Sequence, residues 1–175
     1  SFLLSPFAGD DNFTARALKQ IKPRELQLDP GYYMYGGGFI YTQGFFALLA
    51  SLLGLIQTGH GLDYYQMNPG EMGKIFSVLR FCVVLFCAVG VGIYYHVTQR
   101  TFGRRVAFLA TSVVLSMPLS HQAARTVEPH MFVLPLFMAA MLFILKAVQE
   151  DTRRNYVYAA ALTGATIGTQ AINFY

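Results

Sequence analysis

Three carboxylates stand beside long apolar runs of this sequence and are its best candidates for proton chemistry. Asp10 and Asp11 open a stretch with helical character, and Glu128 precedes Pro129 and His130 in a short polar break between two apolar runs. A charge next to hydrocarbon is costly unless it has a partner or a task. A carboxylate held in such a position can accept the proton of an acceptor hydroxyl. We therefore take these acids as the candidate catalytic groups.

Each acid also has a simpler explanation. Asp10 or Asp11 can cap the helix that follows, since acidic side chains suit its positive N-terminal end. Capping and catalysis are compatible, because a helix start also presents free amides to an anion. Glu128 can form an ion pair with Arg125 or remain a solvated loop acid. Together with His130 it could bind a metal, although two residues do not make a metal site and an interfacial histidine is the simpler interpretation.

Two further groups could bind a substrate. Arg80 stands near the start of an apolar run, where it can contact a phosphate or act as a snorkelling anchor. Tyr35 and the tyrosines around it suit an aromatic belt at the membrane interface or a platform for a sugar. The residues that follow, 36–38, are three glycines and predict a flexible turn, because neither a strand nor a Gly-Lys-Ser/Thr ending accompanies them. The glycosylation sequon at 12–14 is expected to be unused beside a catalytic acid.

The elements that must position these groups are apolar helices. Of the 175 residues, 54% are hydrophobic and 13% are charged, whereas soluble domains have about 25% charged residues. The long apolar runs have the length of membrane helices and show no alternation typical of strands. The sequence therefore predicts an all-α, multi-spanning membrane protein. The runs are 39–57, 77–97, 106–120, 131–148 and 156–175.

The basic residues predict the orientation of these helices. They form short clusters between apolar runs instead of one patch, which is typical of topology determinants and not of a nucleic-acid partner. Two clusters should face the cytoplasm, so the loop with Arg125 and Glu128 faces outward. The side of the membrane on which Asp10 lies then depends on run 39–57. Asp10 is cytoplasmic if this run crosses the membrane and external if it does not. The two clusters are Arg100, Arg104 and Arg105, and Lys146, Arg153 and Arg154.

An ordered set of motifs carries a family resemblance. An acidic pair opens an amphipathic helix, an aromatic loop follows, and a later helix ends in an Arg-rich turn before an outer loop with an acid. In this order the sequence resembles the N-terminal part of the polyprenyl- or dolichyl-phosphate-sugar-dependent integral membrane glycosyltransferases. These form the GT-C superfamily, and the group in question contains protein O-mannosyltransferases and lipid A aminoarabinose transferases. The motifs read LDPGYYMYGGGFIYTQGFFALLASLLG, RTFGRRVAFLA and SMPLSHQAARTVEPH.

The resemblance implies a domain organisation. Residues 1–76 would hold the end of a first span and a long outer loop with amphipathic, interfacial helices. Residues 77–175 would form four transmembrane helices, and the chain would be a fragment of a longer protein. Run 39–57 would then lie along the outer leaflet, which brings Asp10 and Glu128 to one side of the membrane.

The resemblance also implies roles for the candidate residues. Asp10 would be the catalytic base, with Asp11 where relatives often have Glu. Glu128 would be the second acid, where relatives frequently have Asp, and it would position the acceptor or help Asp10 hold a divalent metal ion. Arg80 would contact the donor phosphate. The other expected substrate-binding residues are Arg125, Tyr35 and His130.

The expected function is sugar transfer, with inversion, from an isoprenoid-phosphate carrier to an unknown acceptor. It would take place at the outer face of a bacterial or archaeal plasma membrane, or at the lumenal face of the endoplasmic reticulum, with membrane lipids as further partners. One departure weakens the expected phosphate contacts: relatives often have a Lys near the end of the last run, where this chain reads TQAINFY. Two alternatives stay open. One is a transporter or channel subunit with Arg125 and Glu128 as pathway residues, and the other is a membrane scaffold.

Overall fold

The computed structural model describes residues 14, 17, 18, 20, 29, 31, 35–58, 60 and 62–169, most of which are helical and none of which forms a strand. The prediction of an all-α fold is confirmed. Two stretches, Pro69–Phe102 and Pro129–Glu150, are long and apolar enough to cross a membrane. The helices in chain order are α2 (Gly37–Leu52), α3 (Leu62–Met67), α4 (Pro69–Phe102), α5 (Arg104–Ser116), α6 (Pro118–Arg125), α7 (Pro129–Phe132), α8 (Leu134–Glu150) and α9 (Arg153–Thr169).

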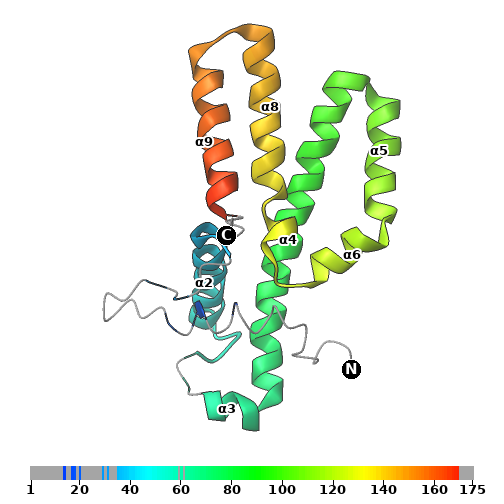
Figure 1. Cartoon of the computed structure of the whole chain (residues 1–175). Helices are drawn as coiled ribbons and strands as arrows, with labels where there is room; N and C mark the ends of the chain where they lie inside the picture. The colour runs from blue at the N-terminus through cyan, green and yellow to red at the C-terminus, as the bar shows by residue number, and fades with distance from the viewer. Residues whose placement is uncertain are drawn as a thin grey trace.

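Helix α4 is the longest element, and α2, α3, α5, α6, α7 and α8 pack against it, whereas α9 packs against α8 and α2 (Figure 1). It begins at Pro69, whose fixed φ suits a first helical turn, and ends at Phe102, because the next residue, Gly103, has a φ of 88° that favours glycine. Its 34 residues extend about 51 Å, well beyond the roughly 30 Å of a hydrocarbon layer. The 19 residues between Arg80 and Arg100 carry no Asp, Glu, Lys or Arg and measure about 28 Å. The first turns of α4 therefore extend past the apolar segment at one end.

Two helical hairpins form the apolar half of the molecule. Helices α4 and α5 join at Gly103, and α8 and α9 join at Asp151, which takes a left-handed φ of 46°. Figure 1 shows both turns at the same end of the molecule, with α2, α3, α6 and α7 toward the other. Helix α4 crosses α8 closely at Gly90, where an added Cβ would lie 2.7 Å from Cγ of Leu134. Glycine at this position lets the two backbones approach.

Helix α2 occupies part of the run 39–57 whose placement the sequence left open. Its 16 residues measure about 24 Å, which is shorter than a hydrocarbon layer. It ends because Gly54 takes a φ of 71°, a conformation that side-chain-bearing residues rarely adopt. Its start lies against the end of α9, since a side chain at Gly36 would meet the carbonyl group of Gly168.

The predicted runs lie within or across these helices. Run 77–97 lies inside α4, run 106–120 covers most of α5 and the start of α6, and run 131–148 lies within α7 and α8. Run 156–175 begins in α9 and continues beyond the described residues.

A buried cluster joins segments that are far apart in the sequence. It contains residues from the N-terminal segment, α2, the first half of α4, the loop before α7, and α7 itself. The cluster includes Val127, the residue before Glu128, and therefore holds the loop of the candidate site in place. Its members are Ala17, Phe39, Ile40, Phe76, Leu79, Cys82, Val83, Val127 and Phe132.

Candidate functional site

Glu128 lies in the short loop between α6 and α7. Its backbone is extended, with φ −122° and ψ 153°, because the residue before a proline is driven away from the helical region. Helix α7 then begins at Pro129, which is buried. The Glu128 side chain is 21% exposed, and its Oε2 lies 4.0 Å from Nε2 of His130. A carboxylate in this position is held near the surface of the buried cluster but stays accessible.

Aromatic packing anchors the loop on its α7 side. Phe132 stacks on Phe86 of α4 with ring centroids 4.1 Å apart and planes at 24°. Its ring also meets that of Phe39 of α2 edge-on, at 5.2 Å and 77°. Stacked and edge-to-face ring pairs of this kind stabilise the fold by more than the burial of their apolar area alone. Glu128 is therefore fixed by one anchor four residues after it, and by a second directly before it.

The second anchor is Val127, which is fully buried. Its carbonyl oxygen accepts a hydrogen bond from Oγ1 of Thr14, at 3.4 Å and across 113 residues of sequence. Thr14 is also fully buried, and Ala17 belongs to the same cluster. The N-terminal segment therefore packs directly against the loop that carries Glu128. The sequence did not predict this contact, because a lone threonine in an amphipathic stretch does not indicate its partner.

Asp10 and Asp11 lie outside the described residues. Their predicted roles therefore stay predictions. Thr14 is the nearest described residue, four positions after Asp10.

The predicted substrate-binding residues differ in their surroundings. Arg80 is half-buried in α4, next to Leu79 of the buried cluster. Tyr35 packs its ring edge-on against Phe39 at 5.7 Å and so supports the same cluster. Arg125 is the last residue of α6, and its side chain lies outside the described part. His130 is exposed beside Glu128.

A metal ion would need more ligands than the described residues bring together. Among them, no group of three or more His, Cys, Asp or Glu side chains could hold a metal. Glu128 and His130 supply two groups, and a protein metal site generally needs three or four. Asp10 lies outside the described residues, so the predicted Asp10–Glu128 pair stays a prediction.

Gln43 is a polar group that the sequence analysis did not single out. It lies on the buried face of α2 and is 0% exposed. Neither its amide nitrogen nor its amide oxygen has a hydrogen-bond partner within the described structure. A buried amide without partners is costly. The only available sequence signal was a long polar side chain in an otherwise apolar run.

One comparison with known proteins identifies the family. The model of the dolichyl-phosphate-mannose-protein mannosyltransferase family matches residues 72–172. Among the predicted site residues, the match includes Arg80, Arg125, Glu128 and His130. No curated protein and no solved structure gives a match.

The family match covers more than half of the 175 residues and confirms the resemblance drawn from the ordered motifs. It also agrees with the two apolar helices that can cross a membrane. The chain belongs to the dolichyl-phosphate-mannose-protein mannosyltransferase family, a group of GT-C-type membrane glycosyltransferases.

Proposed function

We propose that the protein transfers a sugar, with mannose the first to test, from an isoprenoid-phosphate carrier to a hydroxyl acceptor on the outer side of the membrane. The family match supports the reaction class and the isoprenoid-phosphate donor. Asp10 acts as the base, and Glu128 positions the acceptor.

The hydrogen bond from Thr14 to Val127 is the observation that carries this proposal. Four residues of chain reach at most about 14 Å, so Asp10 lies within that distance of Thr14. Glu128 directly follows Val127. A hydrocarbon layer is about 30 Å thick, so a chain this short between Asp10 and the Thr14–Val127 bond favours both acids lying on one side of the membrane. The contact therefore supports one shared face, which a transferase site with both acids requires.

The distribution of charge supports an outer location for that face. The turns at Gly103 and Asp151 lie at the opposite end of the helices from α7 (Figure 1). Six basic and two acidic residues surround these turns, and an excess of Lys and Arg marks the cytoplasmic side. The basic residues are Arg100, Arg104, Arg105, Lys146, Arg153 and Arg154, and the acidic residues are Glu150 and Asp151.

The chemistry follows from the charges that change during transfer. The acceptor oxygen forms a bond to the anomeric carbon as the bond from that carbon to the phosphate oxygen breaks, which inverts the centre. Asp10 takes the acceptor proton. Negative charge grows on the departing phosphate, and the guanidinium groups of Arg80 and Arg125 are the proposed stabilisers of that charge.

The test measures sugar transfer in native membranes from a radiolabelled isoprenoid-phosphate donor. Asp10→Asn should lower kcat by at least about a hundredfold, since a positioned base contributes about 10²- to 10⁴-fold. Glu128→Gln should lower kcat as well, because it removes the charge that positions the acceptor. Glu150→Gln is the matched control, because Glu150 lies at the other end and accepts a hydrogen bond from Asn155 that glutamine can also accept. Normal transfer by both site variants would disprove the assigned roles.

A sidedness measurement tests the shared face separately. Single cysteines at positions 10 and 128, in a protein without Cys82 and Cys87, should both react with an impermeant thiol reagent added outside sealed cells. Reaction from opposite sides would disprove the shared site and would favour a transporter.

A further inference from the structure

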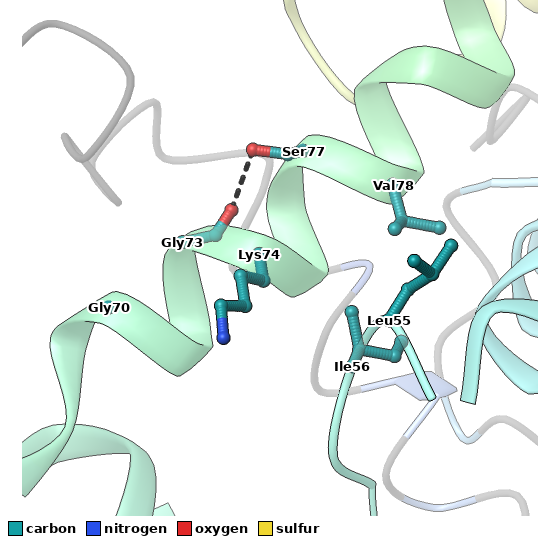
Figure 2. Close-up of a pocket in the computed structure, with 7 residues that line it drawn as sticks. All are labelled: Leu55, Ile56, Gly70, Gly73, Lys74, Ser77 and Val78. Carbon is teal, nitrogen blue, oxygen red and sulfur yellow. Dashed lines mark hydrogen bonds between the residues drawn. The ribbon is translucent and has the colours of Figure 1, made fainter. Parts of the chain in front are cut away.

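A pocket of about 310 Å³ lies between the first turns of α4 and the segment that follows α2 (Figure 2). Its walls differ in chemistry. Leu55, Ile56 and Val78 are apolar, Lys74 carries a positive charge, and Gly70 exposes bare backbone. Figure 2 shows Val78 directed toward Leu55, and Lys74 extending from the preceding turn of the helix. A ligand that fits must combine a negative group with hydrocarbon.

Lys74 is available to such a ligand. Its Nζ lies 2.7 Å from Oε1 of Glu71, one turn earlier in α4. An ammonium group has three donors, so two are left after this contact. The Lys74 side chain is 58% exposed. Glu71 thus orients the ammonium group while leaving it able to donate to a phosphate.

The charge pattern of α4 places this pocket across the headgroup layer and just beyond it. The uncharged segment of α4 ends at Arg80, which marks the edge of the hydrocarbon layer. Val78 is about 3 Å and Gly70 about 15 Å beyond Arg80 along the helix. The polar layer of a bilayer is about 5–8 Å thick on each side, so this part of α4 extends across it.

This pocket lies on a different face of α4 from the buried cluster beside Glu128. Residues two positions apart on an α-helix point about 200° away from each other. Lys74 and Ser77 line the pocket, whereas Phe76 and Leu79 belong to the buried cluster beside Glu128. The pocket therefore lies on the opposite face of α4.

We propose that this pocket binds the headgroup of a membrane phospholipid. The phosphodiester accepts hydrogen bonds from Lys74, and the upper acyl chain covers Leu55 and Val78. Because α4 carries the pocket on one face and the buried cluster on the other, bound lipid stabilises the helix that supports the active site. Phospholipid rather than free phosphate is the ligand, since the pocket walls are mainly apolar.

The test is a thermal-unfolding titration of the purified protein in detergent. Dioleoylphosphatidylglycerol should raise the unfolding temperature, since a ligand that binds only the folded state stabilises it. Dioleoylglycerol, which lacks the phosphate, and inorganic phosphate, which lacks the chains, should not reproduce the shift. An equal shift with either compound, or none with phosphatidylglycerol, would overturn the proposal.

Two variants, Lys74→Ala and Gly70→Leu, should impair the site in different ways. Lys74→Ala removes the positive charge, whereas Lys74→Arg keeps the charge and serves as its control. Gly70→Leu adds bulk at the wall of the pocket without strain, because an added Cβ there meets no atom within 4 Å. Both Lys74→Ala and Gly70→Leu should weaken the apparent lipid affinity by about tenfold or more, as expected for a lost charge-assisted contact.

Matched controls come from the same molecule. Gly92 of α4 also faces open space, and Lys146 lies near the opposite end of the helices. Gly92→Leu and Lys146→Ala should keep the wild-type lipid titration. If Lys74→Ala and Gly70→Leu also keep it, the lipid binds elsewhere and the assignment is wrong.

Discussion

The hydroxyl group of Thr14 donates a hydrogen bond to the carbonyl oxygen of Val127, although 113 residues separate them. Both residues are fully buried. The bond connects the segment that follows Asp10 to the loop that carries Glu128. The bond is therefore one of the two anchors of the Glu128 loop, and changes at Thr14 should affect that loop.

Thr14→Val tests this contact. Valine keeps the shape of threonine but cannot donate, so the variant should lose about 0.5–1.5 kcal/mol of unfolding free energy, the usual net value of one hydrogen bond. Sugar transfer should fall as well, because the loop loses an anchor. Thermal unfolding in detergent and the donor assay measure the two effects. Thr14→Ser, which keeps the hydroxyl group, should restore most of both.

Thr14→Val also removes the glycosylation sequon that begins at Asn12. Asn12→Gln removes the sequon alone and should leave stability and transfer unchanged. If Asn12→Gln reproduces the losses, the hydrogen bond is not their cause.

The sequence predicted the helical class because its apolar runs are long and almost free of charge. It also grouped the two basic turns on one side, and the structure places Gly103 and Asp151 at one end of the molecule (Figure 1). Both predictions rest on local composition, which a sequence displays directly.

The surroundings of Glu128 could not be predicted in this way. Its anchors come from Thr14, Phe39 and Phe86, which lie on three separate segments. Residue types do not reveal which distant segments pack together. The end of α2 could not be predicted either. Hydropathy carries no information on backbone angles, and the helix ends near Gly54 because that residue adopts a positive φ.

Gln43→Leu should stabilise the protein. The Gln43 amide is fully buried without a hydrogen-bond partner in the described structure, and such a group costs about 1–3 kcal/mol. Leucine replaces it with an apolar group that suits the face shared with Phe39 and Ile40. The expected result is a higher unfolding temperature in detergent. An unchanged or lower temperature would mean that the amide is satisfied in solution.

The control for this variant is Gln57→Leu, which should not stabilise. Gln57 is exposed, and its Oε1 accepts a hydrogen bond from the hydroxyl group of Tyr64 at 3.2 Å. Leucine there removes an acceptor and buries little apolar surface.

Gly90→Leu should weaken the packing of α4 on α8. An added Cβ would lie 2.7 Å from Cγ of Leu134 and 2.9 Å from the backbone nitrogen of Pro135, which cannot move freely. Overpacking of this kind costs about 1–3 kcal/mol, and the unfolding temperature should fall accordingly. Gly92→Leu, on an open face of the same helix, should cause no such loss. Equal stability of the two variants would show that the helices separate easily at Gly90.

The turn between α8 and α9 should lose stability at high pH. The hydroxyl group of Tyr156 donates to Oδ1 of Asp151 at 3.0 Å. This hydrogen bond raises the pKa of Tyr156 above its ordinary value, and the nearby charge of Asp151 raises it further. A pKa that is higher in the folded state gives stability that is fully present below the unfolded pKa, which is about 10 for tyrosine. That stability is lost as the pH rises through the folded pKa.

Difference titration of phenolate absorbance between the wild type and Tyr156→Phe measures this pKa. The stability advantage of the wild type over Tyr156→Phe should be constant below about pH 10 and shrink above it. Asp151→Asn removes the charge but keeps a residue that tolerates a positive φ, so it should lower the pKa of Tyr156 toward its ordinary value without breaking the turn. A Tyr156 pKa that does not change in Asp151→Asn would show that the contact is absent in solution.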